Sequence, residues 1–89
     1  MSKNSREWFW LSFVDEDNPP GQRFLGVVIV QGRDFVDATR EAWRRGINFG
    51  GEVVGGPIEL DRLPLLSNED RNRLLNKEEA TRLANTKLS

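Results

Sequence analysis

A glycine-rich segment at positions 46–56 contains the residues whose types best suit a binding site. Glycine lets the backbone approach a ligand closely and lets its N–H groups point at an anion. Within this segment Asn48 can hydrogen-bond a base or a sugar, and the ring of Phe49 can stack on a base. Together with Gly50 and Gly51, these residues predict a ligand-binding loop.

The same glycines also have a purely structural interpretation. Gly46 is most simply the stop of a helix, Gly50-Gly51 can form a turn, and Gly55-Gly56 can form a bulge in a strand. Five glycines in eleven residues exceed what one helix-to-strand connection needs, so both interpretations stay open. The segment lacks the Gly-Lys-Ser/Thr ending of a P-loop, and it follows a helix, whereas a dinucleotide fingerprint precedes one.

Basic and aromatic side chains precede the glycines. Arg40 and Arg44 can clamp a phosphate beside the loop, and Trp43 and Trp10 can stack on a purine. Each group has a structural alternative. Arginines near the C-terminus of a helix compensate its dipole and pair with carboxylates one turn away, and tryptophans pack in cores and interfaces.

The residues available for catalysis are few. The chain contains no His, Cys or Tyr, so general bases and nucleophiles reduce to carboxylates, lysines and hydroxyl groups. Glu52 and Glu59 flank the glycine segment and would serve the enzymatic alternative, a small carboxylate-dependent hydrolase. Disulfides and thiolate or imidazole metal sites are excluded, and the acidic run 15–17 lacks the spacing of a calcium loop. We expect no catalytic residue, no metal site and no cofactor.

Three segments have the composition of strands. Segment 8–14 is rich in aromatic residues and segment 24–30 is a run of apolar ones. Pro19-Pro20-Gly21 lies between them, which predicts an antiparallel pair joined by a long loop. A third strand is expected at 52–54, interrupted by Gly55-Gly56-Pro57, and the proline indicates an edge strand or a bulge.

One helix is expected between the second and third strands. Asp34 is suited to its N-cap with Asp37 at the third position, and Gly46 is suited to its C-terminal cap, with Ile47 making the apolar contact that follows. Helical periodicity then separates a buried stripe from a polar side. The stripe comprises Phe35, Ala38 and Ala42 with Val36, Thr39 and Trp43 beside it, and the polar side comprises Arg40, Glu41, Arg44 and Arg45.

These elements predict a small α+β domain: a ββαβ core at 7–60 with an antiparallel or mixed sheet and one main helix, followed by a charged, partly helical C-terminal extension at 61–89. The eight aromatic residues all precede position 50. In the extension, two capping-box pairs predict one kinked helix or two short helices. The pairs are Ser67 with Asp70 and Asn76 with Glu79.

Both faces of the first two strands are apolar. One helix covers only one face of a three-stranded sheet, and monomers rarely expose an apolar patch of several hundred Å². The extension or a second copy must cover the other face, and because the extension is polar we expect a homo-oligomer. Strict alternation groups Trp8, Trp10 and Val14 against Phe9, Leu11 and Phe13 in the first strand, and Phe24, Val28 and Val30 against Leu25, Val27 and Ile29 in the second.

The blocks WFWLSF, FLGVVIV and GINFGGEV resemble those of a family of short, uncharacterised bacterial and phage proteins, over about residues 8–58. That resemblance implies a compact module and no particular activity. More loosely, in size and style, the chain looks like phage anti-defence sponges, which are small, non-enzymatic, oligomeric proteins that sequester immune signalling nucleotides.

The expected function is therefore that of a homo-oligomeric binding protein, with a cyclic nucleotide or ADP-ribose type of ligand near the glycine segment. The alternative is a protein-interaction module that docks through its apolar sheet face or its C-terminal helix. A net charge of −1 disfavours long nucleic acids as partners. The polar N-terminus and the absence of a long apolar run favour a cytoplasmic protein, bacterial or in an infected cell, without a membrane partner.

Overall fold

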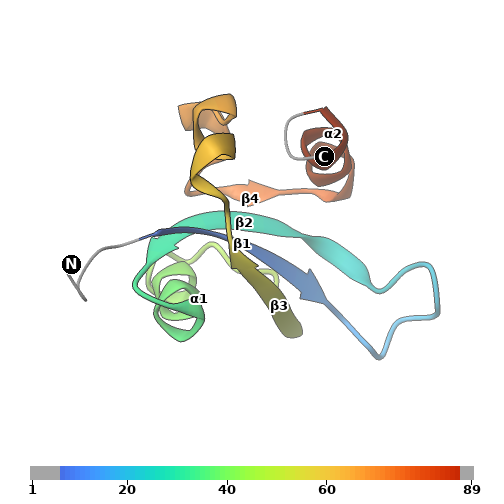
Figure 1. Cartoon of the computed structure of the whole chain (residues 1–89). Helices are drawn as coiled ribbons and strands as arrows, with labels where there is room; N and C mark the ends of the chain where they lie inside the picture. Colours follow the sequence, from blue (N-terminus) through green and yellow to red (C-terminus); the bar gives the residue numbers. More distant parts are fainter. Residues whose placement is uncertain (1–6, 87–89) are drawn as a thin grey trace.

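The computed structural model describes residues 7–86, apart from the side chains of Leu60 and Thr86, and it confirms the α+β class. In chain order the elements are β1 (Glu7–Val14), β2 (Phe24–Gly32), α1 (Phe35–Arg44), β3 (Glu52–Pro57), the 3-10 helices η1 (Leu60–Leu65) and η2 (Asn68–Asp70), β4 (Leu74–Leu75) and α2 (Lys77–Thr86). The four strands form one antiparallel sheet in the order β3-β1-β2-β4. Helix α1 lies on one side of this sheet, and the other helical elements lie on the opposite side (Figure 1).

A bulge in β2 decides which faces its first residues occupy. Strands β1 and β2 pair antiparallel as predicted, with Phe13 opposite Gly26, but the next residue, Val14, is opposite Phe24. Leu25 is therefore the extra residue of a bulge, which shifts the alternation that follows. As a result Leu25 packs on the α1 side of the sheet and Phe24 on the other side, so the predicted faces of these two residues were wrong.

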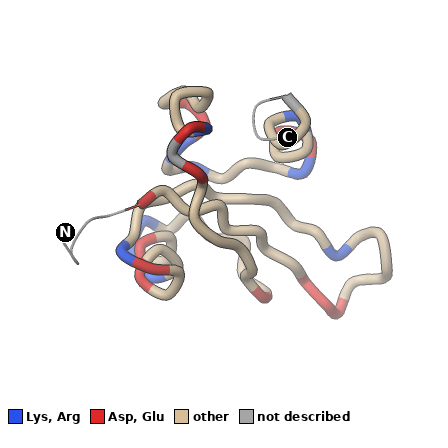
Figure 2. The backbone as a smooth tube through the Cα atoms, in the orientation of Figure 1, with Lys and Arg blue, Asp and Glu red and all other residues tan. Residues whose placement is uncertain are grey.

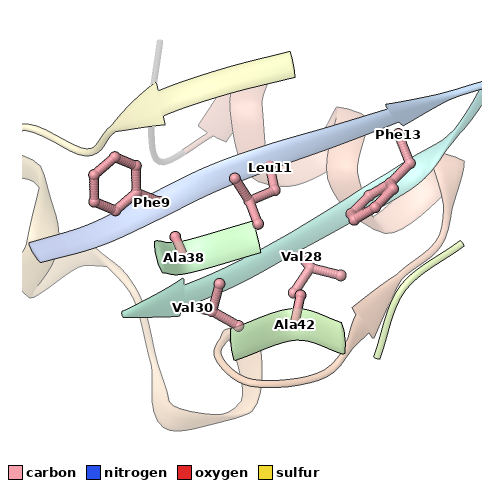
Figure 3. Close-up of a cluster of buried hydrophobic side chains, with 7 residues drawn as sticks. All are labelled: Phe9, Leu11, Phe13, Val28, Val30, Ala38 and Ala42. Carbon is pink, nitrogen blue, oxygen red and sulfur yellow. The ribbon is translucent and has the colours of Figure 1, made fainter. Parts of the chain in front are cut away.

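The α1-side core fills the space between α1 and the sheet (Figure 3). Its members come from β1, β2 and α1, and each is at most 3% exposed. The helix contributes only alanines to this fully buried set, and such small side chains let its backbone approach the strands closely. The core consists of Phe9, Leu11, Phe13, Val28, Val30, Ala38 and Ala42.

The extension-side core covers the opposite face of the sheet. Val27 and Ile29 of β2 are fully buried there, beneath apolar residues that follow β3 in the chain. The face that motivated the expectation of a homo-oligomer is thus covered around β2 within one copy, although Trp8 and Trp10 stay half-buried. Self-association remains a prediction. The residues that cover Val27 and Ile29 are Ile58, Leu66, Leu75, Ala80 and Leu83.

The predicted caps of α1 are confirmed. The Asp37 N–H donates to the Asp34 carboxylate at 2.8 Å, which makes Asp34 the N-cap. At the other end Gly46 has φ of +70°, and the N–H groups of Gly46 and Ile47 donate to carbonyl oxygens of the last turn at 3.0 Å. This pair of hydrogen bonds is the Schellman motif, which explains the glycine at this position.

The extension folds into more pieces than predicted. Both capping boxes form: Asp70 accepts from the Ser67 N–H at 2.8 Å, and the Glu79 N–H donates to the Asn76 side chain at 2.9 Å. The second heads α2, but the first heads only the three residues of η2. The chain then adds β4 to the edge of β2 instead of continuing a helix, because Leu75 is buried against β2 in an extended conformation.

Arg71 fastens the extension to the sheet. One of its guanidinium nitrogens donates to the carbonyl oxygens of Leu63 at 3.0 Å and Leu66 at 3.1 Å. The guanidinium carbon also lies 4.8 Å from the centroid of the Trp8 ring, within the range of a cation–π contact. Arg71 thereby joins η1 to the half-buried tryptophan of β1.

Candidate functional site

The loop that follows α1 uses its aromatic residue for packing. The rings of Phe49 and Phe13 have centroids 5.8 Å apart at an interplanar angle of 55°, an arrangement common in cores. Phe49 also lies directly over Gly26, where an added Cβ would overlap its ring. In this structure Phe49 is therefore engaged with the α1-side core rather than presented to a ligand.

The glycines of the loop make the turn into β3. Gly50 and Gly51 both have left-handed backbones, with φ of +77° and +70°, and a Cβ at Gly51 would overlap the carbonyl oxygen of Val14. Gly50 has open space around it, and Asn48 before it is half-buried. The close approach of Gly51 to β1 supports its structural interpretation, whereas Gly50 is free to face a ligand.

The last two glycines lie inside a strand. β3 continues through Gly55 and Gly56 to Pro57, and its pairing with β1 shows no shift of register. The predicted interruption at this place was therefore wrong. Gly55 is required by close approach, because its φ is +158° and a Cβ there would overlap the carbonyl oxygen of Trp10.

Three of the predicted ligand residues gather on the outer face of α1. Arg40, Trp43 and Arg44 line one groove of about 630 Å³, together with two carboxylate residues of the same helix. Lys or Arg and Asp or Glu positions follow one another closely along α1 (Figure 2). The groove therefore offers cations, carboxylates and one indole ring within a few turns of helix. Its lining residues are Asp37, Arg40, Glu41, Trp43 and Arg44.

Trp43 is the most prominent aromatic surface in the described part of the chain. Its exposed fraction is 61%, and Val36, seven residues earlier on the same face, is 59% exposed. Both were predicted to flank the stripe of Phe35, Ala38 and Ala42, and both are exposed because α1 buries only Ala38 and Ala42 with Glu41 beside them. A second groove of about 260 Å³ runs between Trp43 and Val36.

Glu41 is the anion that organises the arginines. It is only 9% exposed, although it was predicted on the polar side of α1. Arg44 donates to both of its carboxylate oxygens at 2.6 Å, and the Arg45 Nε donates at 2.6 Å. These hydrogen bonds, first that of Arg44 and then that of Arg45, hold the pKa of Glu41 below its ordinary value of 4.5. The same pairing raises the pKa of Arg44 and fixes its guanidinium at the rim of the groove.

This ion-pair cluster predicts a pH-dependent contribution to stability. We expect Glu41→Gln to lower the free energy of unfolding by about 1 kcal/mol at neutral pH, because both partners are partly exposed. The folded-state pKa is lowered, so the contribution is fully present above about 4.5 and is lost as the pH falls through the folded value.

Urea denaturation of the parent and the Glu41→Gln variant between pH 3 and pH 7 would measure the difference in their free energies of unfolding. The gap between the two proteins should narrow as the pH falls. A gap that stays constant over the range would contradict the assignment of the effect to the charge of Glu41.

Trp10 belongs to a different surface. It lies on the face of the sheet opposite α1, packed against the extension-side core. There it lines a shallow groove of about 430 Å³ with Ile58 and Arg62. Within one copy, Trp10 therefore does not share a pocket with Arg40, Trp43 and Arg44, and the structure separates this part of the predicted site.

The acidic loop after β1 approaches the start of β3. The negative charge of Glu16 raises the pKa of Glu52 above its ordinary value, and a hydrogen bond between the two carboxyl groups adds to this effect. Within residues 7–86, no three or more Asp or Glu side chains are grouped so that they could hold a metal ion. No helix in the same range has the length and apolar character to span a bilayer.

Sequence reasoning found the cations and the indole of the α1 groove, and it expected carboxylates of the same helix to pair with the arginines, but it did not include Val36 in the site. The signal was present in the spacing of Val36, Arg40 and Trp43, which helical geometry places on one face. That face is exposed because α1 packs on the sheet through Ala38 and Ala42, on the other side of the helix. No family model, curated protein or solved structure matches the chain.

Proposed function

We propose that this chain is a non-enzymatic, self-associating binding protein that holds a nucleotide-derived ligand in the groove on the outer face of α1. The observation that carries the proposal is the exposed indole of Trp43 between two arginines, Arg40 and Arg44, in one groove. An indole offers a stacking face for a base, and guanidinium groups offer paired donors to phosphate oxygens. The ligand class is a cyclic nucleotide or an ADP-ribose type of signal.

The pairing of Arg44 with Glu41 supports this assignment. An arginine already fixed by a carboxylate loses little conformational entropy when a phosphate approaches it. Arg40 is exposed beside it and supplies the second cation. The groove is open, about 630 Å³ in volume, which suits a ligand of nucleotide size that lies along the helix.

The carboxylates of the groove favour a small ligand over a nucleic-acid strand. Asp37 and Glu41 lie among the cations, and the whole chain has a net charge of −1. The carboxylates would repel a phosphate backbone that lies along this helix, whereas the amino group of a single base can donate a hydrogen bond to a carboxylate oxygen. The chain has no His, Cys or Tyr, and we therefore propose binding without turnover.

Titration calorimetry with a panel of cyclic nucleotides and ADP-ribose tests the proposal. We expect one member to bind, and Trp43→Ala to weaken that binding roughly ten- to a hundredfold, because base stacking on an aromatic ring contributes about 1–3 kcal/mol. Arg40→Gln should weaken it roughly tenfold. Quenching of tryptophan fluorescence in the parent provides a second reading.

The matched control is Arg23→Gln, which removes an exposed arginine of the β1–β2 loop, and this loop lies away from α1 (Figure 1). It should leave the affinity unchanged. Binding that survives in Trp43→Ala, or the absence of binding by every nucleotide of the panel, would overturn the nucleotide assignment.

A protein-interaction module is the second candidate, and the exposed pair Val36 and Trp43 favours it. Exposed apolar side chains around an arginine are typical of interface centres, in which Trp and Arg contribute most. The partner would dock on α1, because α2 already buries Ala80 and Leu83 against the sheet. A stoichiometric partner that co-purifies with the parent and is lost in Val36→Asp would support this alternative.

The looser likeness to phage anti-defence sponges suggests the biological role that we propose, which is the sequestration of a signalling nucleotide. A sponge binds an immune signalling nucleotide and does not convert it, in the cytoplasm of a bacterium or of an infected cell. Native mass spectrometry of protein purified from cells that make the signal separates this role from hydrolysis. A sponge carries the intact nucleotide, whereas a hydrolase would carry or release its product.

A further inference from the structure

Strand β3 forms one edge of the sheet, and within residues 7–86 its strand partner is β1 alone. Proteins block the unpaired backbone groups of such edges with charges, prolines or bulges, or they use them to pair with another chain. Val54, in the middle of β3, is apolar and 57% exposed, and the two glycines after it have no side chains. From Val53 to Gly56 the edge therefore carries no blocking residue.

The register of β3 shows which of its backbone groups face outward. The N–H of Ile58 donates to the carbonyl oxygen of Trp8 at 2.8 Å, so these two residues form a hydrogen-bonded pair. Such pairs alternate with non-hydrogen-bonded ones along an antiparallel ladder. Counting back along the unbroken register, Gly55 and Val53 fall in non-hydrogen-bonded pairs. Their N–H and C=O groups point away from β1, toward the open edge.

We propose that a second copy of this chain pairs with β3 antiparallel at this edge, with Val54 on the twofold axis, so that two four-stranded sheets join into one. In this register Val53 of each copy faces Gly55 of the partner subunit, and each pair exchanges both of its N–H···O bonds. The inference supplies the interface for the self-association in the proposed function and does not depend on the ligand.

Pro57 selects this register over its neighbour. Pro57 also occupies an outward position, but it has no N–H to donate. If the axis passed through Gly55, the carbonyl group of Val53 would face Pro57 of the partner subunit and would lack a donor. With the axis at Val54, the two valine side chains lie directly opposite each other in a non-hydrogen-bonded pair, where Cα atoms are about 4.5 Å apart and apolar surface is buried.

The charges beside the axis agree with this arrangement. Glu52 falls opposite Gly56 of the partner subunit, and its side chain projects on the face of the sheet that is opposite α1. On that face Arg62 lines the groove beside β3. Within one copy Glu52 lies near the like charge of Glu16, whereas across the proposed interface it faces a glycine, beside a groove lined by both the partner's Glu59 and the partner's Arg62. The register therefore sets no like charge directly opposite Glu52.

Cysteine cross-linking tests the register, because the chain contains no cysteine. We expect Val54→Cys to form a disulfide-linked dimer under mild oxidation, since Cα atoms about 4.5 Å apart permit a disulfide. The matched control is Leu74→Cys, on the opposite edge of the sheet, where the native side chain is 39% exposed. Cross-linking should be roughly tenfold faster at position 54, because the paired strands hold the thiols at high effective concentration.

Light scattering without any nucleotide provides the second reading. The parent should have twice the 10.2 kDa mass of one chain. Val54→Lys sets like charges opposite each other, so it should have the mass of a monomer, and circular dichroism should show that it is folded. Leu74→Lys should stay a dimer. A monomeric parent, or equal cross-linking at positions 54 and 74, would overturn the interface. Because no ligand is present, either result leaves the nucleotide assignment to be decided by its own titration.

Discussion

Replacing Leu75 with alanine is expected to lower the free energy of unfolding by about 2–5 kcal/mol, the range measured when a buried leucine leaves a cavity. Leu75 is 1% exposed and packs on the extension-side core from β4, a strand of only two residues. Its main-chain partner across the sheet is Val27, which is itself fully buried. Truncation of Leu75 would therefore open a cavity at the point where the extension joins the sheet.

The neighbouring residue provides the control. Leu74 has the same chemistry and lies in the same strand, but it is 39% exposed, so Leu74→Ala should cost less than about 1 kcal/mol. Urea denaturation followed by tryptophan fluorescence would measure both variants. Equal and small losses in the two variants would mean that the extension does not contribute to the core in solution.

Replacing Gly26 with alanine is expected to destabilise the protein by about 3 kcal/mol or more, because the change would both strain the backbone and overpack the space around the new side chain. Gly26 has φ of +153°, which side-chain-bearing residues rarely adopt. An added Cβ would overlap the ring of Phe49 and would lie 2.5 Å from the carbonyl oxygen of Leu75. The residue sits beside the bulge of β2, so the strand cannot shift without disturbing both cores.

Gly56→Ala is the matched control for Gly26→Ala. A Cβ at Gly56 meets nothing within 4 Å, and its backbone is not left-handed, so the change in stability should stay within about 0.5 kcal/mol. Thermal unfolding monitored by circular dichroism compares the two variants directly. If Gly26→Ala were as stable as Gly56→Ala, the contact of Phe49 with β2 would be wrong, and its ring would again be available to a ligand.

The local signals of the sequence predicted the first half of the fold well. Asp34 and Gly46 placed both ends of α1, because a cap side chain and a left-handed glycine act within one turn of helix. The strands β1 and β2 followed from composition alone. The faces of Phe24 and Leu25 did not, since a bulge depends on how two strands pair and not on either strand by itself.

The packing of the extension was beyond local reasoning. Its buried residues Leu66, Leu75 and Leu83 belong to a 3-10 connection, a short strand and a helix, so no single periodicity links them. Because the extension has no aromatic residues, its contribution to a core was not expected, and the residues that it buries are all aliphatic. The candidate site shows the same division: Arg40, Trp43 and Arg44 share a helix face that periodicity reveals, whereas the position of Trp10 depends on tertiary packing.

The placement of Leu83 has a consequence for the order in which a growing chain can hide its apolar surface. The α1-side core is complete once Val53 has been synthesised, but Val27 and Ile29 wait for Leu83, roughly 30 residues later, which takes about 1.5–6 s at about 5–20 residues per second. During that interval one face of the sheet is covered by α1, whereas the apolar side chains on the opposite face are still exposed. Burial of this face of the sheet thus depends on the synthesis of Leu83 and not only on the pairing of β1 with β2.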